Sequence, residues 1–156
     1  MYSLSSACGL TVKPDLTVVI KNRKTSISFP AQRWKELTHC AHYIDEAVKQ
    51  LKDKQYVKYR QHIGGAYYVS VTTGFYCVDI RKFVKRGDDN IKPTFDGLAL
   101  RVWEWTRLVQ TISQLKKDYP AMNDVILCSE QLDHHNQIGY LSCGECNPHG
   151  NFLDYM

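Results

Sequence analysis

Six cysteine and histidine residues near the C-terminus have the types and the spacing that metal binding requires. They lie in the stretch "CSEQLDHHNQIGYLSCGECNPHG" and are Cys128, His134, His135, Cys143, Cys146 and His149. The two thiolates of a Cys-x-x-Cys turn can share one tetrahedral zinc ion, which then needs two further ligands. We predict one structural zinc ion held by Cys128, Cys143, Cys146 and His149, with His134 or His135 as the alternative to His149.

The same residues allow two other interpretations. Ordinary reduced cysteines in a loop-rich segment would give this pattern without a metal. The "CGEC" turn at Cys143–Cys146 could also be a redox pair, but no βαβ pattern of the thioredoxin type surrounds it.

No arrangement of residues predicts catalysis. The sequence has no phosphate-binding loop, dinucleotide fingerprint or nucleophile elbow. The pair His134–His135 beside cysteines would suit a metal-dependent nuclease or a Cys/His hydrolase, but no paired acids or positioned base accompany it. We therefore expect that the protein is not an enzyme.

A second candidate site consists of basic residues placed among strand-forming apolar ones. The stretch "VDIRKFVKRGDDNIKPTFDGLAL" contains Arg81, Lys82, Lys85, Arg86 and Lys92, and an earlier segment contains Lys21, Arg23 and Lys24. Binding of an unpaired nucleic-acid strand needs cations along a groove and flat side chains on which bases stack. Tyr67, Phe75 and Phe83 are the stacking candidates. The alternatives are solvated surface charges and cross-strand aromatic packing.

The charge of the chain is unevenly distributed. The net charge of +4 divides into +6 for residues 1–60, +3 for residues 61–119 and −5 for residues 120–156, which contain no Lys or Arg. An anionic partner would be steered to the first 119 residues and repelled by the tail. No groove-reading recognition helix is evident, so we expect little sequence preference.

Two helices and a set of strands must position these residues. Apolar residues recur every three or four positions in 30–51 and 102–119, which predicts two amphipathic helices with buried faces. Between them, residues 66–71 and 75–83 alternate with a period of two, Gly74 marks a turn, and residues 91–100 form an irregular strand. The predicted fold class is α+β, a curved antiparallel sheet followed by a long amphipathic helix.

An internal repeat is also predicted. At a fixed offset of 71 residues "IKNRKTSISFPAQRWKEL" aligns with "IKPTFDGLALRVWEWTRL", so that Trp34 matches Trp105 and Lys21 matches Lys92. The predicted domains are an abridged repeat at 1–55, a complete repeat at 56–120 and an acidic Cys/His-rich tail at 121–156. We expect the first repeat to lack much of the early meander, because few residues precede Leu16.

The second repeat resembles a known family, the single-stranded-DNA-binding transcriptional coactivators of the positive cofactor four type. The resemblance covers about residues 60–119 and rests on "YVSV", "VDIRKF", "IKP", "GLAL" and "WTRLVQTI" in this order. It implies a curved sheet and a helix, with two protomers paired through their helices so that two β-ridges face unpaired strands. A tandem copy could build that pair as a pseudo-dimer within one chain, and the alternative is a homodimer.

The residue-level match to the family is partial. Arg81 and Lys92 stand where the family places basic nucleic-acid contacts. However, Asp96 stands where the family has a Lys, Val84 stands where it has a Trp, and the turn between the first two strands is shorter. These departures affect the affinity and the path of a bound strand more than the fold.

Composition and length set the remaining limits. With 44% hydrophobic and 12% aromatic residues in 156, the chain suits one core or two small units. No apolar run approaches the roughly 20 residues that span a bilayer, and no signal-peptide pattern opens the chain. Six cysteines without a sign of export indicate reduced thiols, in the nucleus or the cytoplasm.

We therefore expect a non-catalytic protein that binds single-stranded or melted DNA in transcription or replication, together with proteins of those processes. A replication accessory of a virus would suit a divergent, duplicated chain. The alternative is a protein-interaction module, stabilised by zinc through the tail, with no direct nucleic-acid role.

Overall fold

A computed structural model describes residues 1–86, 90–134 and 137–149. Its first half is a four-stranded antiparallel sheet in the order β1-β2-β3-β4, followed by two helices. The elements are β1 (Tyr2–Ser3), β2 (Gly9–Val12), β3 (Val18–Lys21), β4 (Ser26–Phe29), α1 (Ala31–His39) and α2 (Ala41–Lys52). Alternation explains these strands, because in β4 the serines face solvent while Ile27 and Phe29 are buried.

The second half repeats this order with longer strands and one helix. A four-stranded antiparallel sheet β5-β6-β7-β8 precedes α3, and short helical turns follow. The elements are β5 (Lys58–Gly64), β6 (Tyr67–Thr72), β7 (Phe75–Arg86), β8 (Asn90–Arg101), α3 (Val102–Asp118), η1 (Pro120–Asp124), η2 (Cys128–Glu130), η3 (Leu132–His134) and α4 (Gln137–Leu141). The predicted α+β class, with a sheet followed by a helix, is confirmed.

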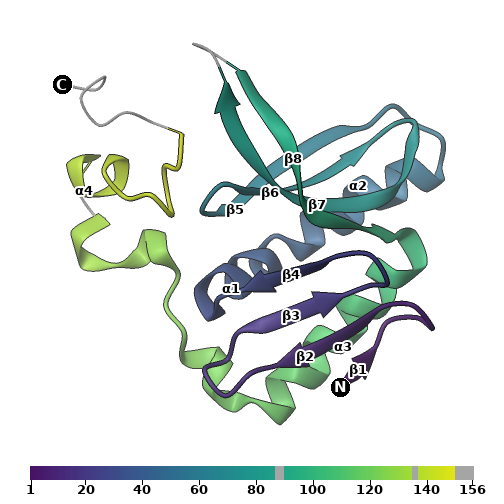
Figure 1. The fold of residues 1–156 in the computed structure, drawn as a ribbon, viewed down its shortest axis with the longest axis horizontal. Coiled ribbons are helices and arrows are strands. Elements are labelled where there is room, and N and C mark those ends of the chain that lie inside the picture. Colours follow the sequence, from purple (N-terminus) through teal and green to yellow (C-terminus); the bar gives the residue numbers. More distant parts are fainter. Residues whose placement is uncertain (87–89, 135–136, 150–156) are drawn as a thin grey trace.

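The two halves share one hydrophobic core. Figure 1 shows the sheets one above the other, with α3 behind the first sheet and α2 behind the second. Elements of both halves contact each other: α1 contacts β5, α2 contacts β6, and β4 contacts β8. Buried residues from Leu10 in β2 to Leu115 in α3 form a single cluster. The predicted boundary near residue 55 therefore separates two topological units that are packed together.

Polar contacts also link the halves. The Trp105 indole donates from Nε1 to Asp45 Oδ1 at 2.6 Å, which joins α3 to α2. Glu104, which is 7% exposed, accepts from the Arg101 backbone N–H at 2.9 Å and from the Ser5 hydroxyl at 2.6 Å. Such a carboxylate caps its own helix and at the same time fixes a loop of the other half.

The last two strands of each sheet, β3–β4 and β7–β8, have the same register. Val18 pairs with Phe29, Ile20 with Ile27, and Lys21 with Ser26; Val78 pairs with Leu100, Ile80 with Leu98, and Arg81 with Gly97. Lys21 in β3 therefore stands where Arg81 stands in β7. This match supports the internal duplication, which stays a prediction.

Three expectations about the first repeat are wrong. Its early meander is present, because β1 and β2 need only the 12 residues from Met1 to Val12. Lys21 does not correspond to Lys92, since Lys21 lies on β3 and Lys92 on β8, whose 12 residues extend well beyond the length of β4. The helix predicted over 30–51 is divided at Cys40, whose φ of −96° and ψ of 5° interrupt the helical backbone.

At Gly97 the backbone of β8 lies close to β7. A Cβ at Gly97 would lie 2.3 Å from both the Ile80 carbonyl oxygen and the Arg81 Cβ. We expect Gly97→Ala to lower the free energy of unfolding by about 1–3 kcal/mol, because backbone must shift to relieve the overlap. Urea denaturation measures this change. Gly144→Ala is the control, since nothing lies within 4 Å of its added methyl group, and an equal loss in both variants would contradict the steric explanation.

Candidate nucleic-acid interface and metal centre

The outward face of the second sheet is hollowed. Val69, Val78 and Ile80 point into the core, so their neighbours along the strands point outward. The resulting hollow has a volume of about 480 Å³. Its lining residues are Ser70, Thr72, Phe75, Cys77, Asp79, Arg81, Phe83, Pro93 and Ala99. Three predicted site residues, Phe75, Arg81 and Phe83, thus line one surface; the Phe75 side chain is 67% exposed, whereas Phe83 is only 6% exposed.

Arg81 is held by groups of the protein itself. Its Nε and Nη2 each donate to an Asp79 carboxylate oxygen at 2.6 Å, and its Nη1 donates to the Thr94 carbonyl at 2.8 Å. The hydrogen bonds that Arg81 donates to Asp79 raise the pKa of Arg81, despite the opposing effect of burial. Because Asp79 compensates its charge, Arg81 contributes less to an anion-binding field than the sequence indicated.

An aromatic and cationic cluster borders this hollow, and sequence reasoning missed it. The Arg60 guanidinium lies 5.3 Å from the Phe83 ring centroid and 5.8 Å from that of Tyr68. Tyr68 also contacts Phe83 edge-on at 5.1 Å and lies 5.2 Å from the His62 ring. These residues come from three neighbouring strands, so only the strand register brings them together.

The first sheet has an outward hollow of the same size. It measures about 480 Å³ and is lined by Lys21 and Arg23 together with the β1–β2 segment. Both cations are exposed, and among the described residues neither forms an ion pair. The hollows therefore lie on equivalent faces, with Lys21 in the first at the position of Arg81 in the second.

The remaining predicted binding residues lie outside both hollows. Lys24, Lys85 and Lys92 are exposed, and Lys82 is partly buried. Lys92 pairs with Val84 in the register, which puts it on the opposite face of the β7–β8 hairpin from Phe83. The side chain of Arg86 lies outside what the structure describes.

Tyr67 is covered by other side chains. Its hydroxyl donates to Asp96 at 2.8 Å, and the Arg33 guanidinium lies 4.6 Å from its ring centroid. Burial, then the contact with Asp96, raises the pKa of Tyr67 to about 12. In this conformation the ring packs against the protein, so the structure favours the packing interpretation for Tyr67 over base stacking.

The tail brings together four residues that could hold a metal ion. The ligand atoms of Cys128, His134, Cys143 and Cys146 all lie within 4.8 Å of one another. The Cys128 and Cys143 sulfurs are 3.7 Å apart. Four ligands about 2.3 Å from a central ion define a tetrahedron with edges of about 3.8 Å. The cluster thus has the size of a tetrahedral metal site, with η2, η3 and the turn after α4 supplying its members.

The thiols of this cluster differ in acidity. Burial raises the pKa of Cys143, but N–H groups of Cys146 and Glu145 and the side chains of His134 and Cys128 lower it to about 7. Burial raises the pKa of Cys128, and burial with the Cys128 hydrogen bond raises that of Cys146. A thiolate at Cys143, supported by backbone donors, is the form in which cysteine binds a metal.

The predicted fourth ligand is corrected by this geometry. His149 lies outside the group, and its ring stacks on Tyr68 with a centroid distance of 5.9 Å and an interplanar angle of 13°. His134 occupies the place that the sequence assigned to His149, because η3 turns it towards the cysteines. The other alternative, His135, lies outside the described residues.

The tail is fastened to both halves of the protein. Glu145 accepts from Arg33 of α1 at 2.9 and 3.1 Å, and its carbonyl accepts from the Gly65 N–H at 2.8 Å. Gly64 and Gly65 permit this approach, since an added Cβ would lie 2.3 Å from Glu145 Oε1 and 2.6 Å from Arg33 Nη2, respectively. The described part of the acidic tail therefore lies at the β5–β6 turn, and none of its residues lines either hollow.

Comparisons with known proteins identify no relative. No family model matches the chain, and neither the curated proteins nor the solved structures contain a match. Among the described residues, no helix combines the length and the apolar character needed to cross a bilayer.

Proposed function

We propose that this protein binds unpaired nucleic-acid strands without catalysis, along the outward faces of its two sheets. The observation that carries the proposal is the pair of hollows of about 480 Å³, one lined by Lys21 and Arg23 and the other by Phe75 and Arg81. An exposed ring with nearby cations suits a single strand, whose bases stack and whose phosphates need positive charge. Single-stranded or melted DNA in transcription or replication is the proposed setting.

Two features of the fold support this choice. The two sheets are both present in one chain, so a monomer supplies two binding surfaces as a pseudo-dimer would (Figure 1). Arg60 and Tyr68 add an exposed cation and a partly buried ring near the second hollow, whereas Phe83, a predicted stacking residue, is only 6% exposed and packs against both. Each exposed stacking contact is worth roughly 1–3 kcal/mol per base.

Fluorescence anisotropy of labelled single-stranded and duplex oligonucleotides across a salt series tests the proposal. We expect tighter binding of the single strand and an affinity that falls as salt rises. Each phosphate contact contributes about 0.7 to the slope of log K against log salt for single strands. Lys21→Ala combined with Arg23→Ala should therefore reduce that slope by about 1.4. The slope itself, rather than affinity alone, is the decisive readout.

A matched control removes the same charge elsewhere. Lys49 and Lys117 are exposed on α2 and α3 and line neither hollow. Lys49→Ala combined with Lys117→Ala should leave the salt slope within error of wild type. Absence of single-strand binding at low salt, or equal slopes in the two double variants, would refute binding along these faces.

A second proposal concerns the tail, which we infer to hold one structural zinc ion. The three sulfurs and one imidazole lie within 4.8 Å of one another, and such a donor set binds zinc in preference to magnesium or calcium. Bound zinc would join η2, η3 and the turn after α4 into one unit, and Arg33 and Gly65 would hold that unit against the sheets.

The tail also favours a second candidate function, a protein-interaction module. Ile126, Leu132 and Ile138 are 58%, 84% and 61% exposed, respectively, and lie within a short part of the chain. Exposed apolar residues of this kind suit a protein partner better than a polyanion. In that case the salt series would show no single-strand binding, and zinc would serve to present this surface.

A further inference from the structure

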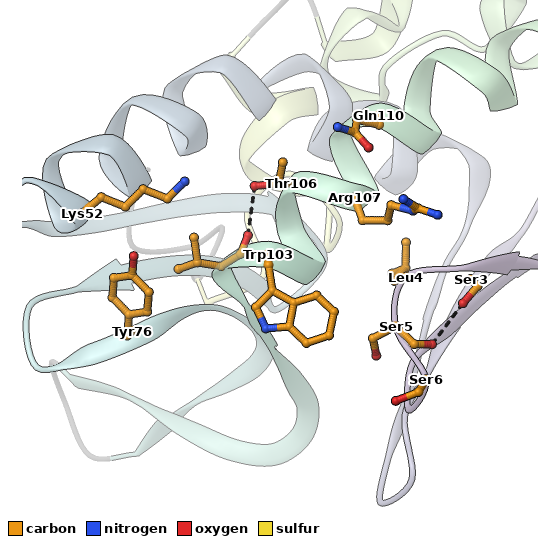
Figure 2. A pocket seen from close by; sticks show the side chains of 11 residues that line it. Ser3, Leu4, Ser5, Ser6, Lys52, Tyr76, Trp103, Thr106, Arg107 and Gln110 are labelled. Atoms are coloured by element: carbon orange, nitrogen blue, oxygen red, sulfur yellow. Dashed lines mark hydrogen bonds between the residues drawn. The ribbon is translucent and has the colours of Figure 1, made fainter.

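A third hollow lies at the junction of the two halves, outside the sheet faces. It measures about 790 Å³ and is formed by the β1–β2 loop, the end of α2, the start of β7 and the first turns of α3. Figure 2 shows Trp103 at its centre, with Tyr76 and Lys52 on one side and Arg107 and Gln110 on the other. A volume within the usual range of about 300–1,000 Å³ can enclose a small ligand or one unit of a polymer.

Two large aromatic side chains stand exposed in this hollow. Trp103 is 54% exposed and Tyr76 is 61% exposed. The first turn of α3 packs against the core through Val102 and Trp105, which flank Trp103 in the sequence and are buried. Tyr76 shares a strand face with Val78 but lies beyond the edge of the core. Because neither ring is needed for packing, their exposure in a concave surface points to a ligand with a flat face.

The charge of the hollow selects the kind of ligand. Lys52 and Arg107 are exposed cations, and among the described residues neither forms an ion pair. No Asp or Glu lines the hollow, while Gln110 and Ser6 add neutral hydrogen-bonding groups. Rings beside unpaired cations are complementary to a nucleobase and its phosphate.

The wall of the hollow is fixed and leads to the first sheet. Leu4 is 3% exposed, and the Ser5 hydroxyl donates to buried Glu104 at 2.6 Å, so the loop is anchored to α3. Ser3, Ser5 and Ser6 also line the hollow that contains Lys21 and Arg23. The third hollow therefore adjoins the hollow of the first sheet along the surface.

We propose that this hollow binds one nucleotide of an unpaired strand that lies along the face of the first sheet. The base stacks on Trp103 and Tyr76, and the adjacent phosphates lie near Arg107 and Lys52. This inference rests on the proposed single-strand binding and assigns it a further nucleotide site beside the first sheet.

Tryptophan fluorescence reads out this site selectively. Of the three tryptophans, Trp34 and Trp105 are 4% and 0% exposed, so a bound base can reach only Trp103. An oligothymidylate longer than one face should quench the emission of the wild type. Trp103→Ala should lose that quenching and bind the oligonucleotide about tenfold more weakly, which corresponds to about 1.4 kcal/mol. Trp103→Phe should retain most of the affinity.

Further variants separate this site from the sheet faces. Arg107→Ala should lower the salt slope by about 0.7. Tyr56→Ala, which removes a 79% exposed ring outside the three hollows, should change neither affinity nor quenching. If the wild type binds the oligonucleotide but Trp103→Ala binds equally well, the proposed Trp103 site is wrong and the sheet proposal stands. If the wild type binds no strand, both fail. If Trp103 responds to a polyglutamate peptide and not to the oligonucleotide, the site belongs to a protein partner.

Discussion

Purified from zinc-containing medium, the protein is expected to carry one zinc ion per chain, and His134→Asn is expected to carry substantially less. His134 supplies one of four ligand atoms that lie within 4.8 Å of one another, and an amide is a poor zinc ligand. Structural zinc sites in small peptides contribute about 10–16 kcal/mol of apparent binding free energy, so loss of a ligand has a large effect. Elemental analysis after desalting measures the zinc content directly.

The matched control for this prediction is His149→Asn. His149 has the same side chain and lies in the same tail, but it stacks on Tyr68 instead of joining the cysteines. Its zinc content should equal that of the wild type. The opposite result, with zinc lost in His149→Asn and kept in His134→Asn, would restore the ligand set that the sequence alone predicted. A wild-type protein without zinc would remove the metal centre altogether.

Loss of zinc should affect the tail more than the rest of the fold. The tail is joined to the rest of the protein mainly by the Arg33–Glu145 ion pair, one backbone hydrogen bond from Gly65 and side-chain hydrogen bonds from Gln32 and Lys35 of α1, whereas the core cluster ends at Met122. Limited proteolysis of His134→Asn should therefore cut within residues 125–149 and leave intact an N-terminal fragment that ends near residue 120. Cleavage distributed evenly over the chain would mean that the core needs the folded tail to stay folded itself.

Trp105→Ala is expected to lower the free energy of unfolding by about 3–5 kcal/mol. The Trp105 side chain is fully buried, and its indole donates to Asp45, so the substitution leaves a cavity and breaks a contact between α2 and α3. For a chain of this size the melting temperature should fall by about 6–20 °C. Calorimetry should still show one transition, because both sheets share the core in which Trp105 lies.

Trp103→Ala provides the comparison in the same helix. Its ring is 54% exposed, so the stability change should stay within about 0.5 kcal/mol. Two separate transitions in Trp105→Ala, one for each sheet, would show that the halves unfold independently and would contradict the shared core.

The sequence could predict those parts of the fold in which each residue's type agrees with its burial. The stripes that include Trp34, Leu37, Trp105 and Leu108 are buried as expected, because helical periodicity depends only on local spacing. β1 was missed because two residues cannot show alternation. β5 was missed because polar residues such as Arg60 and His62 occupy positions that register alone identifies as part of the sheet.

The candidate sites divide in the same way. Lys21, Phe75 and Arg81 could be placed on outward faces from strand alternation, whereas Arg23 lies in the turn between β3 and β4. The sequence does contain a signal for the pairing of Arg81 with Asp79, since residues two apart on a strand share a face. It contains no signal that favours His134 over His149 as a ligand, because that choice depends on how η3 and the turn after α4 fold around the cysteines. The Trp103 hollow combines four segments and could not be read from any one of them.

The arrangement of α3 behind the first sheet has a consequence for synthesis of the chain (Figure 1). The first sheet is complete at Phe29, but the helix that covers it ends only at Asp118, whose carboxylate accepts from the Tyr2 hydroxyl. A ribosome adding about 5–20 residues per second needs roughly 3–13 s to extend from the end of the first unit to that point. During this interval the apolar face of β1–β4 is covered only in part, by α1, whose Trp34 contacts Phe29 edge-on. Productive folding in the cell therefore depends on protecting an unfinished first half until the second half has emerged.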